Sequence, residues 1–174
     1  YPEISYIFDK YGADSLRYFL MSSPAVRAED VCFSEKEVDE VYKKIILRLY
    51  NVVSFYELYK DDSILFANSS KNILDKWIVA RLQQLIYQVT KGIENYQIDK
   101  AISPVSFFVD DLSTWYIRRS RDRFKSDDVE DKKCALATTR IVLLELSKIM
   151  APFTPFIAEE IYKKVGSDKE SVHL

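Results

Sequence analysis

The chain has 174 residues, of which 48% are hydrophobic, and this is enough to bury the core of one domain and excludes a disordered tail. Three glycines and five prolines are too few for the many tight turns of a β-rich fold, which favours an all-α architecture. The formal net charge of −2 excludes a protein that attracts nucleic acid with its whole surface, so any such binding requires segregated charge.

The amino-terminal part predicts two short helices and then a long one. A turn at Gly12 separates the short helices, with Asp14 as the expected cap of the second. Ser34 and Glu37 form a capping box ahead of a helix that runs to about Tyr59. Apolar residues recur in this helix at spacings of three and four, which predicts a core stripe of Val38, Val41, Tyr42, Ile45, Leu49, Val52, Val53 and Tyr56.

The middle of the chain predicts two further long helices. The polar segment 60–72 is the expected linker, and a helix follows from near Asp75 to about Tyr96. The segment 98–124 is expected to be helical throughout, although Pro104 either kinks it or delays its regular start.

The last part predicts a fourth long helix and a short final one. Asp127 or Asp128 is expected to cap the helix that runs to Met150. The final helix opens with Pro155 in its first position and ends near Val165. Four principal helices joined by modest loops predict an antiparallel bundle.

The stretch DLSTWYIRRSRDRFK, residues 111–125, combines aromatic residues with five basic ones. At about 100° per residue it forms two separate stripes on one helix. The basic stripe consists of Arg118, Arg121 and Lys125, and the apolar stripe consists of Phe108, Leu112 and Trp115. One side is expected to pack while another is open to an anion, although a solvated or salt-bridged face is the commoner meaning of clustered arginines.

Arg119 is expected to be more structural than its neighbours. It lies one turn beyond Trp115, so it is predicted to stack on the indole or to pair with a buried carboxylate.

Catalytic and metal-binding patterns are weak in this sequence. Asp110 and Asp111 point about 100° apart on a helix, so they are more readily a cap or salt-bridge partners than an acid–base pair. Cys32 and Cys134 are far apart and His173 is the single histidine, so neither a disulfide framework nor a zinc site is supported. We expect a reducing cytosol, with no membrane partner because no apolar run reaches about 18 residues.

Four stretches together carry a family resemblance. They are DKYGADSLRYFLMSSPAVRAEDVCFSE, ILDKWIVARLQQLI, FVDDLSTWYIRRSRDRF and MAPFTPFIAEEIY. In this order they resemble the anticodon-binding domain of class Ia aminoacyl-tRNA synthetases. WYIRRSRDRF is most similar to the isoleucyl branch, whereas the first and last stretches are shared with valyl and leucyl relatives.

The resemblance implies a binding role within a larger cytoplasmic enzyme. Residues 1–33 would form a stem-contact segment and residues 34–174 the anticodon-binding bundle. The HIGH and KMSKS signatures that hold ATP in the family are absent. ATP and Mg²⁺ would therefore belong to a separate catalytic domain, and this chain is expected to need no cofactor and to catalyse no aminoacylation alone.

The resemblance also suggests which residues meet tRNA(Ile). Arg118, Arg121 and Lys125 would contact phosphates, with Arg123 as a further candidate. Trp115 and Tyr116 would be core residues or stacking platforms for anticodon bases, and their spacing favours the core.

Arg17 and Arg27 are the candidates in the stem-contact segment, with helix packing or an interdomain salt bridge as the alternative. Two other readings of the whole chain remain. It could belong to a valyl- or leucyl-tRNA synthetase, or it could be a helical protein-interaction or scaffold module.

Overall fold

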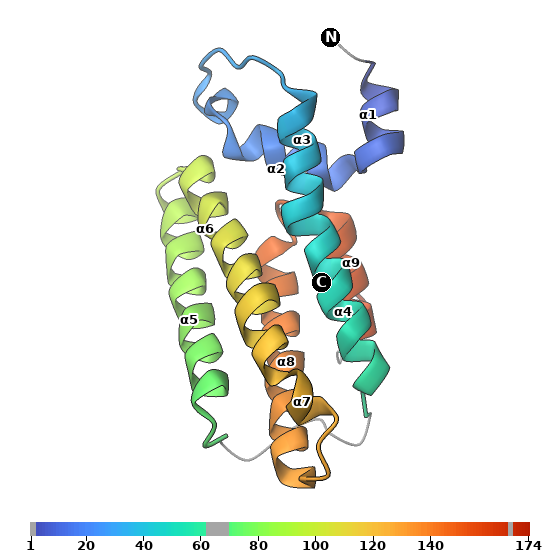
Figure 1. Cartoon of the computed structure of the whole chain (residues 1–174). Helices are drawn as coiled ribbons and strands as arrows, with labels where there is room; N and C mark the ends of the chain where they lie inside the picture. Colours follow the sequence, from blue (N-terminus) through green and yellow to red (C-terminus); the bar gives the residue numbers. More distant parts are fainter. Residues whose placement is uncertain (1–2, 62–69, 167–168) are drawn as a thin grey trace.

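The computed structural model describes residues 3–61, 70–166 and 169–174, and this part of the chain is built from helices without strands (Figure 1). The all-α prediction is therefore confirmed. The amino-terminal helices are α1 (Ile4–Tyr11), α2 (Ala13–Ser22), the 3₁₀ turn η1 (Pro24–Arg27), α3 (Glu35–Val41), the π-helical segment η2 (Tyr42–Ile46) and α4 (Leu47–Tyr59). The remaining helices are α5 (Ile73–Glu94), α6 (Ile98–Asp110), the π-helical segment η3 (Asp111–Ile117), α7 (Arg118–Phe124), α8 (Val129–Met150) and α9 (Pro155–Lys164).

Four long rods form the bundle. The segments α3, η2 and α4 follow one another as one rod, and α6, η3 and α7 form a second. Together with α5 and α8 they alternate in direction, as predicted, while α9 packs beside α8 and α1 and α2 cover one end of the bundle (Figure 1). No described helix combines the length and hydropathy needed to cross a lipid bilayer.

Side-chain caps set the starts of several helices. The Ser34 hydroxyl accepts from the backbone N–H of Glu37 at 3.4 Å, as one half of the predicted capping box. Asp128 rather than Asp127 caps α8, because its carboxylate accepts from two backbone N–H groups at 3.1 Å. Helix α5 begins at Ile73, two residues earlier than predicted, because the Asn72 side chain caps it. Residues 62–69 of the predicted linker lie outside the described part of the chain.

Helices α5 and α6 approach each other closely at Gly92. A Cβ atom added to this glycine would lie 2.7 Å from the Cα atom of Ala101. Glycine is therefore required here for the spacing of the two helices and not for a special backbone conformation.

Asp14 has a different partner from the one predicted. Gly12 occupies the N-cap position of α2, and Asp14 lies inside the first turn of that helix. Its buried carboxylate accepts from the backbone N–H of Phe156 at 3.4 Å and of Ile157 at 2.7 Å. Asp14 thus caps α9, which lies more than a hundred residues later in sequence, and burial raises its pKa.

Two further side chains fasten α2 to the bundle. Arg17 donates to the carbonyl oxygens of Pro152 and Phe153 at 3.2 and 3.1 Å, in the turn between α8 and α9. The Tyr18 hydroxyl donates to the carbonyl oxygen of Ile102 in α6 at 3.1 Å. The amino-terminal helices therefore pack against the bundle through polar contacts as well as apolar ones.

Candidate nucleic-acid interface

Helix α7 presents its basic side chains to solvent, as the helical spacing predicted. The exposed cations are Arg118, Arg119, Arg121 and Lys125. None of the four forms an ion pair with another described residue, whereas most other cations of the bundle have a carboxylate partner. Their charge is therefore available to an anion outside the protein.

Arg119 stacks on Trp115, as expected from their spacing. Its guanidinium carbon lies 3.8 Å from the centroid of the indole ring, and Trp77 of α5 lies 6.5 Å from Trp115, ring centroid to ring centroid. Trp115 was placed on the apolar stripe, but its side chain is 46% exposed. The pair forms a flat surface with a positive charge.

The π-helical segment η3 explains the altered position of Trp115. Five of the buried residues of this rod form a row at intervals of four, namely Phe108, Leu112, Tyr116, Ser120 and Phe124. In a regular α-helix each step of four turns about 40° too far, so such a row would rotate out of the core. The wider turns of η3 keep the row facing inwards and leave Trp115 at the surface.

Arg121 lies on the opposite side of α7. Its guanidinium carbon is 5.8 Å from the centroid of Phe55 in α4. Arg121 therefore lies toward α4, whereas Arg119 lies over Trp115, whose ring is beside Trp77 of α5.

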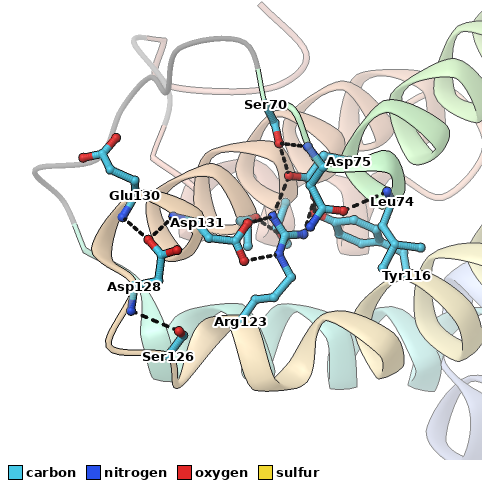
Figure 2. Close-up of polar contacts among 12 residues, drawn as sticks. Ser70, Leu74, Asp75, Tyr116, Arg123, Ser126, Asp128, Glu130 and Asp131 are labelled. Carbon is cyan, nitrogen blue, oxygen red and sulfur yellow. Dashed lines mark hydrogen bonds and ion pairs between the residues drawn. The ribbon is translucent and has the colours of Figure 1, made fainter.

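Arg123 differs from its basic neighbours, because its side chain is only 11% exposed. It donates to both carboxylate oxygens of Asp75 at 2.7 and 2.8 Å and to both of Asp131 at 2.8 and 2.7 Å (Figure 2). Hydrogen bonding to Arg123 holds the pKa of Asp131 below its usual value. This corrects its inclusion among the phosphate candidates: all three guanidinium nitrogens are engaged, so Arg123 is a structural residue that joins α5, α7 and α8.

Tyr116 belongs to the same buried cluster. Its side chain is fully buried, and its hydroxyl donates to Asp75 at 2.8 Å (Figure 2). Burial is the largest cause that raises the pKa of the Tyr116 phenol, and the nearby carboxylate of Asp75 is the next. Tyr116 is therefore a core residue, the alternative that its spacing favoured, and it offers no ring to a base.

Asp110 and Asp111 are salt-bridge partners, one of the roles expected for them. Asp110 pairs with Arg48 of α4, and Asp111 accepts from Arg81 of α5 at 2.8 Å. The two neighbouring carboxylates thus connect the same rod to the helices on either side.

The two candidates from the stem-contact segment lie far from α7. Arg17 is held by backbone carbonyls, and Arg27 pairs with Glu29 at 2.9 Å and with Asp99. Arg17 belongs to α2, which covers the end of the bundle opposite to α7 (Figure 1), and Arg27 belongs to η1, which directly follows α2. A role for them in contacting the stem stays a prediction.

Two further exposed residues were not among the predicted candidates. Lys100 and Phe107 of α6 are exposed, and Phe107 is 67% exposed. Both residues lie outside the helical positions of α6 that face the core, and this position is what the sequence could have shown. Among the described residues no group of three or more His, Cys, Asp or Glu side chains is arranged to hold a metal ion.

The chain was then compared with known proteins. The family described as the anticodon-binding domain of tRNA ligase matches residues 75–174. Isoleucine–tRNA ligases of Chlamydia muridarum and Chlamydia pneumoniae are 42% and 41% identical over the whole chain, which covers 18% and 17% of their lengths. The chain thus spans less than a fifth of these relatives.

A solved structure shares the fold. It is a LeuRS–tRNA–LeuAMS ternary complex from Agrobacterium radiobacter K84, with a TM-score of 0.61 and 17% identity. The match covers 97% of this chain and 20% of the other, which supports the bundle architecture.

Proposed function

The chain belongs to the family of anticodon-binding domains of tRNA ligases, and on this premise we propose that it binds the anticodon stem and loop of a tRNA through the exposed surface of α7. Its role is recognition, and the chemistry of aminoacyl transfer belongs to other parts of the longer protein.

One observation carries the proposal most directly. The exposed cations Arg118, Arg119, Arg121 and Lys125 have no carboxylate partner among the described residues, and the Arg119 guanidinium carbon lies 3.8 Å from the centroid of a half-exposed indole. Neutralising phosphates releases condensed counterions, which supplies affinity, while unstacked loop bases stack on aromatic and guanidinium planes. Both features are present within the eleven residues from Trp115 of η3 to Lys125, which directly follows α7.

We infer that the cognate tRNA is tRNA(Ile) and that the longer protein is an isoleucine–tRNA ligase. This is supported by two relatives of that name at 42% and 41% identity over the full chain. We assign ATP and Mg²⁺ to its catalytic region, since this sequence lacks the HIGH and KMSKS motifs. We infer a cytoplasmic location, which fits the two free cysteines.

The test is a binding titration with an isoleucine anticodon stem–loop at several salt concentrations, beside valine and leucine stem–loops. We expect preference for the isoleucine loop and a steep dependence of affinity on salt. Arg118→Ala and Arg121→Ala should each weaken binding and lower the salt slope by about one unit.

Lys36→Ala is the matched control. Lys36 is also exposed, but it lies in α3 at the opposite end of the bundle from α7 (Figure 1). It removes the same formal charge and should leave affinity and salt slope almost unchanged. Failure of the folded chain to bind any stem–loop would overturn the proposal, and so would equal salt slopes in the wild type and both α7 variants.

A further inference from the structure

An open cavity of about 510 Å³ lies along the seam between α5 and α6. The residues that matter for its chemistry are Arg81, Gln88, Lys100, Ser103, Pro104 and Phe107. The cations of α7 are not among the residues that line it.

An uncovered aromatic ring forms one wall of this cavity. Phe107 is 67% exposed although it projects from a helix whose other large apolar residues are almost all buried. Leaving so much apolar surface in water forgoes roughly 1–2 kcal/mol of burial free energy, which a partner on this ring would recover. A planar ring with an open face is a stacking surface for any nucleobase.

The polar groups of the cavity suit the edge and the phosphate of a nucleotide. Lys100 forms no ion pair with another described residue, and Gln88 is exposed and offers both an amide donor and an acceptor. Pro104 lacks the N–H that would bond to the carbonyl of Lys100, four residues earlier, so this carbonyl lacks its regular helical donor.

Two cations and one carboxylate are among the residues that line the cavity, namely Arg81, Lys100 and Asp99. Asp99 pairs with Arg27, and Arg81 pairs with Asp111 at 2.8 Å. Lys100 is thus the lining cation without an ion pair to another described residue, and its charge is available to a phosphate.

The cavity also continues the surface described above. The seam runs on through the Arg81–Asp111 pair to Trp77 and Trp115. Trp115 follows Phe107 by eight residues, which is about 12 Å along the helix axis. The same rod thus carries the exposed ring of Phe107 and the indole of Trp115, which has the Arg119 guanidinium over it.

We propose that the α5–α6 cavity binds a single unstacked nucleotide of the bound RNA loop. The base stacks on Phe107, the amide of Gln88 contacts its edge, and Lys100 contacts the adjacent phosphate. The inference rests on the proposed function, because it places a second contact on the RNA that α7 holds.

The test compares Phe107→Ala with Tyr87→Ala in binding of the isoleucine stem–loop. Tyr87 of α5 is 65% exposed and does not line the cavity, so it is a matched aromatic control. We expect Phe107→Ala to weaken binding roughly 5- to 100-fold without changing the salt slope, since no charge is lost. Phe107→Trp should restore affinity, and Lys100→Ala should lower the salt slope by about one unit.

The outcomes separate the two proposals. If Phe107→Ala binds like the wild type while Arg118→Ala and Arg121→Ala bind weakly, the cavity is not an RNA site and the proposed function stands. Such a result would also be expected if the cavity served a protein partner. If neither α7 nor cavity variants differ from the wild type, both proposals fail. Circular dichroism of each variant establishes that the helices are intact.

Discussion

The guanidinium of Arg123 and the carboxylate of Asp75 form a two-point ion pair, with N–O distances of 2.7 and 2.8 Å, across 48 residues of sequence. Asp75 lies in the first turn of α5 and Arg123 in the last turn of α7. The pair therefore joins the ends of two antiparallel rods, and Asp131 extends it to the start of α8.

Removal of Asp75 should destabilise the fold strongly. Asp75→Ala leaves the Arg123 guanidinium with one carboxylate partner and removes the acceptor of the Tyr116 hydroxyl. Breaking a buried pair in this way typically costs about 3–5 kcal/mol. Urea denaturation followed by circular dichroism measures the loss.

The two partners of this pair should not act independently. We expect the double variant Asp75→Ala, Arg123→Ala to be less destabilised than the sum of the single variants, because the second change removes a charge already left without its partner. Arg118→Ala, on the exposed face of the same helix, should change stability by less than about 0.5 kcal/mol. Additive single effects would show that the pair is not coupled.

Asp14→Ala should loosen the contact between α2 and α9. The substitution removes the acceptor for the first backbone N–H groups of α9, a loss of about 1 kcal/mol for a helix cap. Asp14→Asn should cost less, because burial disfavours the carboxylate charge and an amide oxygen still accepts. Hydrogen exchange at the Ile157 amide distinguishes the Asp14→Ala variant from the Asp14→Asn variant. Equal protection of this amide in both variants would contradict the capping role of Asp14.

Gly92→Ala should also destabilise the chain, although alanine is the better helix former. The new methyl group would lie 2.7 Å from the backbone of Ala101, and overpacking of this kind costs about 1–3 kcal/mol. Thr90→Ala, at an exposed position of the same helix, is the control and should be neutral or slightly stabilising. A thermal melt that ranks the two variants the other way would refute the tight approach.

Glu159 should titrate far below an ordinary glutamate. Hydrogen bonds from Lys163, and then from the backbone N–H of Val172, lower its pKa from 4.5 to about 2. Since the folded-state pKa is depressed, the stabilisation is fully present above about pH 4.5 and is lost as the pH falls towards 2.

The carboxyl resonance of Glu159, followed by NMR against pH, checks this directly. Exchange of the Val172 amide should accelerate over the same range, because Glu159 accepts from it at 2.9 Å. A midpoint near 4.5 would contradict the prediction. Glu145, which pairs with Lys148 on α8, serves as the comparison residue for a simple surface pair.

Local sequence rules predicted most of the bundle, because helix signals act within a few residues. Caps at Ser34 and Asp128 and Pro155 at the first position of α9 are of this kind. The stacking of Arg119 on Trp115 was predictable for the same reason, since four residues bring the two side chains to one face.

The features that were missed depend on distant partners or on altered helix geometry. In the sequence Arg123 cannot be distinguished from its exposed basic neighbours, because Asp75 comes into contact with it only in the folded chain. Asp14 resembled a local cap but faces a helix that begins at Pro155. A constant rotation per residue could not anticipate η3, so the spacing favoured the core for Trp115 and left its surface position as the alternative.

The Arg123 cluster has a consequence for the direction from which RNA can arrive. Two aspartates surround one arginine there, so the group carries one formal negative charge in excess and repels phosphate. The lower end of the bundle is therefore electrostatically divided, with an anionic interior side between α5 and α8 and a cationic outer ridge on α7. On the proposed function, a polyanion would approach that ridge from outside, and Arg123, one of the four arginines of the motif, would stay out of contact with it.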